Sequence, residues 1–335
     1  MANLSITSKC NRACSYCFAM EKLGKLPDLQ SFMSLTQYER ALHFLQRSGI
    51  NEVRLLGGEP TLHPQFLEMI QIALARQMRL LIFTGGLVPN KVLHALKKMK
   101  GRKLKLLLNL LHPQEGKPSE HARQRELCKQ LGNCVMPGIN IFSPGIELDF
   151  ILDLIQEYGL IKCVRLGLSH PDPESRNEFL HPNHYPQVGL RATEFAVRAR
   201  KRGVSIDFDC GWVPCMFPEG AMEYLGMGAR QVGLTCSPII DILANGQTIS
   251  CYPLFKHVNL PLPEKHNAVW LRTQYARKQA HDRQVRLHQY CAECTWMIQN
   301  KCSGGCLAAS MRRYRRIEFN VSTGELQNTI RMTAN

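Results

Sequence analysis

The sequence has no segment that would direct the chain out of the cell or hold it in a membrane. Residues 1–9 lack the apolar core of a secretory signal peptide. No run approaches the ~18 consecutive apolar residues of a membrane-spanning helix. Acidic residues are scarce: the chain has 27 Asp and Glu but 42 Lys and Arg. Its formal net charge is therefore +15. We therefore expect a cytoplasmic protein with a basic surface that attracts an anionic partner.

Cysteine, in contrast, is abundant. Fourteen cysteines in a chain without an export signal indicate metal ligation rather than disulfides. Cys10, Cys14 and Cys17 form a C-x3-C-x2-C group, which suits three irons of a [4Fe–4S] cluster and leaves the fourth iron open. A closed zinc site needs a fourth protein ligand, and none stands beside this group. Three free cysteines, or a zinc knuckle completed by a distant residue, remain as alternatives.

A second motif, Gly57-Gly58-Glu59-Pro60, follows a predicted strand at residues 52–56. Two glycines at the end of a strand allow the backbone to approach a ligand closely. A carboxylate or a backbone carbonyl is a suitable acceptor for an ammonium group. Alone this motif is a weak turn signal, but it stands one strand after the cysteine group.

Together the two motifs resemble the signature of the radical S-adenosylmethionine (SAM) enzymes, including the aromatic residue before the last cysteine. The resemblance implies that SAM binds the open iron and is cleaved reductively to methionine and a 5′-deoxyadenosyl radical, which takes hydrogen from a substrate. The residues that we assign to SAM binding are Tyr16, Gly57, Gly58, Glu59, Pro60, Thr84 and Asn109. For Thr84 and Asn109, the alternative is that they are ordinary polar loop residues without a role in binding.

Apolar runs alternate with amphipathic helices from Leu4 to Leu168, which predicts six parallel strands in βαβ units. Right-handed crossovers curl such a sheet in one direction. We predict an α/β fold, a partial (β/α)6 TIM-like barrel with a cysteine-rich C-terminal domain, and the resembled family has this fold. Ligands of such barrels gather at the C-terminal ends of the strands. The predicted divisions are a radical SAM domain at 1–204, a cluster-binding domain at 205–316 and a tail at 317–335.

The C-terminal half holds a second field of cysteines. Cys236 and Cys251 follow a C-x9-G-x4-C pattern, and the last four cysteines follow C-x2-C-x7-C-x3-C. Both resemble the SPASM extension, which holds auxiliary [4Fe–4S] clusters in enzymes that mature peptides. This chain departs from the family in a longer gap, residues 295–301, and in lacking the final cysteine. The eight candidate ligands are Cys210, Cys215, Cys236, Cys251, Cys291, Cys294, Cys302 and Cys306.

Eight thiolates are the number that two auxiliary clusters need. The resemblance assigns Cys215 to the cluster of Cys236, Cys251 and Cys306, and we complete the other cluster with Cys210. Three alternatives stay open: a zinc ribbon made by the last four cysteines, one auxiliary cluster with spare cysteines, and an open iron with Cys210 or Cys215 as a catalytic thiol. Cysteines in apolar helical or strand contexts are predicted to be inert core residues, namely Cys128, Cys134 and Cys163.

The combined resemblance implies a peptide maturase that crosslinks, epimerises or fragments a residue of a ribosomally made precursor. Its catalytic side chains are not identified by the sequence. One alternative is a radical SAM dehydrogenase or rearrangement enzyme that acts on a small molecule. Another is a non-catalytic iron–sulfur or nucleic-acid-binding protein, although no nucleic-acid-binding motif occurs.

The predicted partners follow from the same interpretation. The first cluster ligand is already residue 10, and 29 residues follow Cys306, too few for a packed domain without staples. We therefore expect a separate leader-binding protein, docked on a basic surface that includes Arg272, Arg277, Arg283 and residues 312–316. An electron donor such as flavodoxin or ferredoxin is the other expected partner.

Overall fold

The computed structural model describes residues 2–19, 31–173, 176–226, 234–320 and 325–330. One sheet has the strand order β10-β9-β8-β1-β2-β3-β4-β5-β6-β7. Its strands are β1 (Asn3–Thr7), β2 (Glu52–Gly57), β3 (Arg79–Thr84), β4 (Leu104–Asn109), β5 (Val135–Ile141), β6 (Cys163–Leu168), β7 (Ser205–Phe208), β8 (Asp241–Leu243), β9 (Gln247–Ile249) and β10 (Asn259–Pro261).

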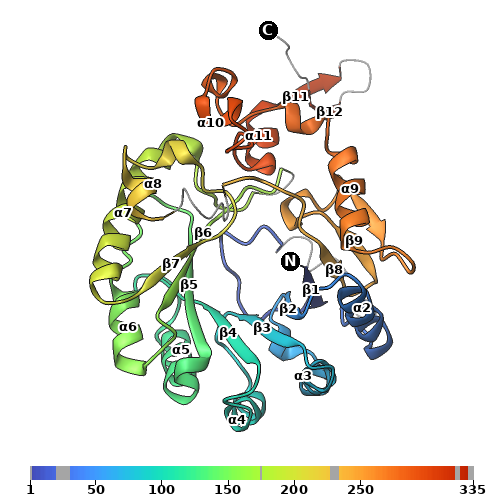
Figure 1. Ribbon diagram of the computed structural model, residues 1–335, viewed down its shortest axis with the longest axis vertical. Coiled ribbons are helices and arrows are strands. Elements are labelled where there is room, and N and C mark those ends of the chain that lie inside the picture. Colours follow the sequence, from blue (N-terminus) through green and yellow to red (C-terminus); the bar gives the residue numbers. More distant parts are fainter. Residues whose placement is uncertain (1, 20–30, 174–175, 227–233, 321–324, 331–335) are drawn as a thin grey trace.

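Strands β1 to β7 are parallel, and a helix follows each of the first six. These helices lie outside the curved sheet (Figure 1). The predicted (β/α)6 partial barrel is therefore confirmed. The six helices are α2 (Leu35–Arg47), α3 (Phe66–Ala75), α4 (Asn90–Lys98), α5 (Pro118–Leu131), α6 (Phe150–Tyr158) and α7 (Tyr185–Lys201).

A capping box opens α2. The N-cap is Ser34, in an extended conformation, and its Oγ accepts a hydrogen bond from the Gln37 backbone N–H at 3.2 Å. The Gln37 side-chain oxygen accepts from the Ser34 N–H at 3.1 Å. Both exposed N–H groups at the start of the helix are thus satisfied.

Both edges of the barrel sheet are completed by later segments. Strand β7, predicted to open the C-terminal region, pairs in parallel with β6, and β8 pairs in parallel with β1. The Asn3 Nδ2 donates a hydrogen bond to the Asp241 Oδ1 at 2.6 Å across the β1–β8 pair. Strands β9 and β10 continue this edge in antiparallel pairing. Three-residue strands are too short to show a period of two, so the sequence did not reveal them.

The C-terminal region carries the remaining helices, and α10 and α11 lie beyond the barrel at the top of Figure 1. The predicted tail is not wholly without structure, because β11 and β12 form an antiparallel pair within residues 315–330. No helix in the described ranges is long and apolar enough to cross a bilayer. The elements of this region are α8 (Ala221–Tyr224), α9 (Ala268–Lys278), α10 (Thr295–Ile298), α11 (Leu307–Tyr314), β11 (Arg315–Asn320) and β12 (Glu325–Ile330).

The buried Asp241 predicts how stability depends on pH. Burial raises the Asp241 pKa to about 7, against the hydrogen bond from Asn3, which lowers it. A carboxyl whose pKa is higher in the folded state stabilises the protein below its unfolded pKa of about 4. That contribution is lost as the pH rises through about 7. We expect Asp241→Asn to remove an effect of about 2–4 kcal/mol between these limits.

The measurement is urea denaturation of the apo protein at about pH 5 and about pH 8. Glu264→Gln is the matched control, because Glu264 forms an exposed ion pair with Arg40 on the surface. The same pH dependence in Asp241→Asn and in the wild type would contradict the prediction.

Candidate functional site

The loop with Cys10, Cys14 and Cys17 starts directly after β1 and crosses the C-terminal ends of neighbouring strands. Asn11 Nδ2 donates a hydrogen bond to the Leu87 carbonyl at 2.8 Å. Arg12 Nη1 donates to the Gly85 carbonyl at 3.4 Å and the Asn109 carbonyl at 3.2 Å. The three thiols are therefore carried by a loop fixed to the ends of β3 and β4, where barrel ligands bind. The sequence analysis missed Arg12, although it stands between two of the cysteines.

The two glycines of the Gly-Gly-Glu-Pro turn approach protein backbone rather than an open ligand site. Gly57 has φ +139°, and a Cβ there would stand 2.1 Å from the Thr7 carbonyl oxygen. A Cβ on Gly58 would stand 2.1 Å from the Lys9 oxygen. Gly58 N–H donates to the Thr7 carbonyl at 2.8 Å, and Glu59 N–H donates to the Lys9 carbonyl at 2.8 Å. The missing side chains thus let the turn lie directly against the start of the cysteine loop.

The Glu59 carboxylate, 2% exposed, accepts hydrogen bonds from its own turn and from the end of β3. The donors are the Thr61 N–H and hydroxyl, the Thr84 hydroxyl and the Gly85 N–H, at 2.6 to 3.2 Å. Burial raises the Glu59 pKa, and these hydrogen bonds oppose the shift. The Glu59 carboxylate therefore joins its own turn to the end of β3, while the Glu59 N–H binds the cysteine loop. Thr84, predicted to contact SAM directly, is itself buried and donates to Glu59 instead.

Asn109 lies at the end of β4 and presents a buried acceptor. Among the described residues, its Oδ1 is one of few buried side-chain oxygens without a hydrogen-bond partner. Its carbonyl accepts from Arg12 and from Gln124 Nε2, the latter at 3.0 Å. An unsatisfied buried acceptor is costly unless a ligand supplies the donor. Asn109 thus suits the predicted contact with a polar ligand.

Tyr16, within the cysteine loop, contacts the segments after β5 and β6. Its ring stacks on Phe142 with centroids 5.1 Å apart, and burial raises its pKa. Its carbonyl accepts hydrogen bonds from the Ser169 hydroxyl and the Asn177 amide, each at 3.2 Å. Ser15 Oγ donates to Glu178 at 2.5 Å. The segment after β6 therefore packs on the cysteine loop.

Four C-terminal thiols form an inner group around His170. The thiols of Cys210, Cys236 and Cys306 lie close enough to that of Cys251 to raise its pKa beyond the increase that burial causes. Burial acts to raise the Cys306 pKa, but the His170 imidazole beside it lowers this pKa more, so that the Cys306 pKa lies below its usual value. His170 Nε2 also lies 3.6 Å from the Cys210 sulfur. His170 follows the end of β6 and thus lies among candidate cluster ligands.

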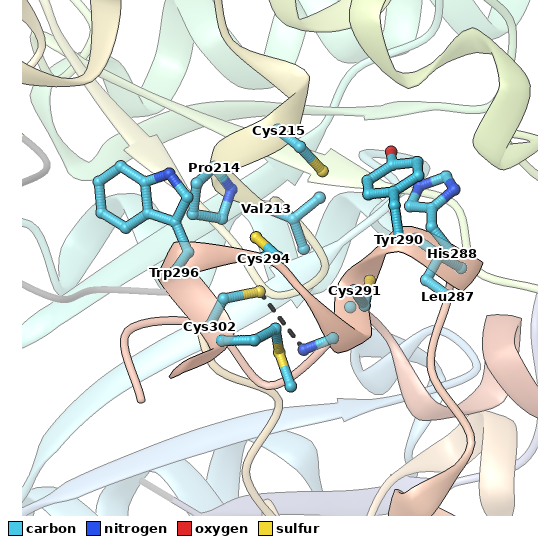
Figure 2. Close-up of a pocket in the computed structure, with 13 residues that line it drawn as sticks. Val213, Pro214, Cys215, Leu287, His288, Tyr290, Cys291, Cys294, Trp296 and Cys302 are labelled. Carbon is cyan, nitrogen blue, oxygen red and sulfur yellow. Dashed lines mark hydrogen bonds between the residues drawn. The ribbon is translucent and has the colours of Figure 1, made fainter. Parts of the chain in front are cut away.

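The other four thiols form an outer group around a hollow that opens to solvent (Figure 2). Cys215 faces it from one side, and Cys291, Cys294 and Cys302 face it from the other. Gly304 N–H donates to the Cys302 sulfur at 3.3 Å, drawn as a dashed line.

This arrangement exchanges Cys210 and Cys215 relative to the predicted grouping. Cys210 lies with Cys236, Cys251 and Cys306, and Cys215 lies with the three preceding C-terminal cysteines. A ribbon of the last four cysteines is not what the fold assembles, because Cys306 belongs to the inner group. Cys128 and Cys134 are buried in the core as predicted, while Cys163 is half-buried on β6.

A charged network that sequence analysis missed lies across β5 to β7. The Arg165 Nε donates to the Asp209 carboxylate at 2.8 Å, and its Nη1 donates to the Asn140 Oδ1 at 2.7 Å. Burial acts to raise the Asp209 pKa, but the Arg165 guanidinium lowers this pKa more, so that the Asp209 pKa lies below its usual value. Val164 and Leu166, on either side of Arg165, are buried in the core, so Arg165 faces the opposite side of the sheet.

The donor set fits iron–sulfur clusters better than single ions. Within the described parts of the chain, no three His, Cys, Asp or Glu side chains converge as ligands of one metal ion. A four-iron cube takes one thiolate at each corner, so its ligands stand around a volume rather than around a point. The three-cysteine loop, the hollow lined by four thiols and the unsatisfied Asn109 oxygen all suit such a group with a polar ligand beside it.

Comparison with known families agrees with the site. Residues 4–115 match the model of the Radical SAM superfamily. The chain belongs to the radical SAM superfamily. Family membership implies a [4Fe–4S] cluster and SAM as cofactors.

Two curated relatives share part of this radical SAM chain. An S-adenosylmethionine-dependent nucleotide dehydratase of Selenomonas ruminantium is 36% identical over 85 residues, which are 25% of this chain and 29% of the relative. A probable GTP 3′,8-cyclase of Pyrococcus horikoshii is 31% identical over 212 residues, 59% of this chain and 66% of the relative. The matched segments therefore span about a third to two thirds of the relatives' lengths.

Solved structures show that the fold likeness extends into the cysteine-rich region. Streptococcus suis SuiB bound to S-adenosylmethionine aligns with a TM-score of 0.65 and 16% identity, covering 92% of this chain and 72% of SuiB. Native anSMEcpe with bound AdoMet aligns with a TM-score of 0.65 and 17% identity, covering 91% of this chain and 89% of that one. This likeness confirms the fold, including the C-terminal region.

The Glu59 network predicts a stability effect at Thr84. Thr84→Val keeps the shape but removes the donor to Glu59 and the acceptor that binds the Gly86 N–H at 3.0 Å. Leaving buried polar groups without partners costs about 1–3 kcal/mol each. We expect a loss of unfolding free energy of this size in urea denaturation of the apo protein. Thr84→Ser keeps the hydroxyl and is the control, and equal stability of the two variants would refute the assigned role.

Proposed function

We propose that this protein cleaves SAM reductively and uses the resulting radical to modify a residue of a ribosomally made peptide. The observation that carries the first half is the hydrogen-bonded contact between the cysteine loop and the Gly-Gly-Glu-Pro turn at the strand ends. A SAM-bearing [4Fe–4S] cluster supplies an electron and a 5′-deoxyadenosyl radical that takes hydrogen from the substrate.

The residues of this chain hold and orient those groups. The Cys10, Cys14 and Cys17 thiolates are the proposed cluster ligands, leaving one iron for SAM. The turn at residues 57–60 is the proposed contact for the methionine part, and the buried Asn109 Oδ1 is an acceptor for a SAM N–H or O–H. Arg12 keeps the loop against β3 and β4. The Glu59 hydrogen bonds hold the turn rigid, so a bound cofactor meets a preformed site.

Two auxiliary [4Fe–4S] clusters are the second part of the proposal. Its support is the assembly of eight thiols into two groups of four, from segments as distant as Cys210 and Cys306. Such clusters would conduct electrons to or from the substrate. The fold likeness to SuiB and anSMEcpe also covers this region. Structures of those proteins are described as bound to the precursor peptide SuiA and to the Cp18Cys peptide, respectively, which supports a peptide substrate here.

A small-molecule substrate is the second candidate, and the curated relatives favour it. They are named as a nucleotide dehydratase and as GTP cyclases, and a nucleotide is a small anionic substrate. Arg165 lies on the sheet face opposite the core residues of β6. It could bind an anionic substrate only if its hydrogen bond to the Asp209 carboxylate were broken. The engaged state of Arg165 is why we rank the peptide first.

The predicted partners stay part of the proposal, with one correction to the docking surface. Arg283 donates to the Cys236 carbonyl at 2.6 Å, and Arg312 donates to the Asp172 carbonyl at 3.1 Å. Both arginines therefore stabilise the fold around the cysteine field. The side chains of residues 313–316 lie outside the described part. A separate leader-binding protein would dock on the exposed end of α9, which carries Arg277 and Lys278, and flavodoxin or ferredoxin would supply electrons.

Loss of the loop thiols tests the SAM chemistry. In Cys10→Ala/Cys14→Ala/Cys17→Ala we expect about four fewer irons per chain and no release of 5′-deoxyadenosine with dithionite. The control is Cys128→Ala, a core cysteine outside the site, which should keep both. Iron analysis and chromatographic detection of 5′-deoxyadenosine are the measurements. Continued SAM cleavage in the triple variant would show that the radical chemistry is not located on this loop.

Substrate class is tested by turnover. Reduced enzyme with SAM is incubated either with precursor peptides encoded beside its gene or with a set of nucleotides, and products are detected by mass spectrometry. We expect a mass change in a peptide, faster with a leader-binding protein and slower at high salt, because exposed charge attraction fades beyond a Debye length of about 8 Å. Turnover of a nucleotide, with every peptide unchanged, would select the second candidate.

A further inference from the structure

We propose that Cys215 is the fourth thiolate of the outer auxiliary cluster, completing the set of Cys291, Cys294 and Cys302. This inference rests on the auxiliary clusters of the proposed function, and it concerns a ligand that the sequence pattern leaves open. Cys306 is the last cysteine of the printed sequence, and it lies in the inner group. The structure brings one upstream thiol, that of Cys215, to the hollow that Cys291, Cys294 and Cys302 line.

The backbone around Trp212 sends two nearby cysteines to different groups. Trp212 is fully buried, stacks on Phe217 with centroids 5.6 Å apart, and donates from its indole N–H to the Leu166 carbonyl at 3.0 Å. Cys210 lies before this anchor, with its sulfur 3.6 Å from His170 Nε2 in the inner group. Cys215 lies after it, on the 3₁₀ turn η5 (Pro214–Met216). With the anchor fixed, the two thiols cannot exchange positions without moving a buried tryptophan.

The outer hollow already has the ligands of a four-iron cluster on its walls. Its lining combines Cys215 on η5 with the three cysteines of residues 291–302, and these lie on facing sides in Figure 2. Four like-charged thiolates facing one hollow would repel each other unless a cation-rich group joins them. The hollow that these four thiols line gives that group its place.

Polar groups next to the sulfurs support the same assignment. The Gly304 N–H donates to the Cys302 sulfur at 3.3 Å, and Tyr290 lines the same hollow as Cys215. Hydrogen bonds to cluster sulfurs raise the reduction potential, because they stabilise the more negative reduced state. A cluster with four thiolates has no open iron for substrate. Its role is therefore electron transfer, and Cys215 is a ligand rather than a catalytic hydrogen donor.

The test uses a background in which the outer cluster is absent. Cys291→Ser/Cys294→Ser should retain about eight irons per anaerobically reconstituted chain, against about twelve in the wild type. Adding Cys215→Ser to this background should change neither the iron content nor the low-temperature EPR spectrum of the reduced protein. Adding Cys210→Ser should change the spectrum or remove about four more irons. Circular dichroism of each variant checks that the chain is folded.

If Cys215→Ser changed the spectrum or the iron content and Cys210→Ser changed neither, the assignment would be overturned and Cys210 would again be the outer ligand. No effect of either variant would also overturn it, because Cys210 would then belong to neither cluster. A wild-type content of about four irons, or zinc in place of iron, would instead remove the auxiliary clusters themselves, and this ligand with them. These results separate failure of the ligand assignment from failure of the proposed clusters.

Tyr290→Phe gives an independent readout in the otherwise intact enzyme. We expect the iron content to stay at the wild-type value and the reduction potential of one cluster to become more negative, because the hollow next to Cys215 loses the polar Tyr290 hydroxyl. Redox titration followed by EPR measures this shift. Combined with Cys291→Ser/Cys294→Ser, the same substitution should shift no remaining cluster. A shift that persists in that background would place Cys215 in the inner cluster and contradict the proposal.

Discussion

The backbone contact between two turns is the constraint on which the site depends. The Gly58 and Glu59 N–H groups bind the Thr7 and Lys9 carbonyls at 2.8 Å, in space that a single Cβ would fill. This contact fixes where the cysteine loop leaves β1. The Glu59 carboxylate then ties the same turn to the end of β3, and Arg12 ties the loop to β4. Each link depends on the preceding one, so the thiols are placed by backbone packing rather than by their own contacts.

The C-terminal region depends on the same sheet. Strand β8 extends it beside β1 and β7 extends it beside β6, so both cysteine-bearing segments leave from its edges. Cys251 is followed by Tyr252, whose hydroxyl donates to Ser5 on β1. Tyr252 also lies close enough to Cys17 to interact electrostatically with it. The inner thiol group is therefore joined to the cysteine loop through one buried side chain, that of Tyr252. The proposed inner cluster would thus lie next to the proposed SAM-binding cluster.

Sequence patterns predicted the features that are local or periodic. Six βα units follow from the repeated alternation of apolar runs and amphipathic helices, and the cysteine loop follows from spacing alone. The sequence did not show what the glycines approach or that Thr84 donates to Glu59, because these contacts join residues 25 to 51 positions apart. It also misplaced Cys210 and Cys215, since spacing carries no information about which way a side chain leaves the backbone. The buried Trp212 decides that, and only packing reveals it.

The most direct test of the account is Mössbauer spectroscopy of the iron-labelled wild type, reconstituted anaerobically and measured with and without SAM. The account predicts about twelve irons in [4Fe–4S] clusters, and it predicts that SAM changes the signal of one iron in one cluster only. The open iron of the Cys10, Cys14 and Cys17 site is the iron that should respond. A SAM-independent spectrum would contradict the cofactor site, and a spectrum of a single cluster would contradict the two C-terminal thiol groups as cluster ligands.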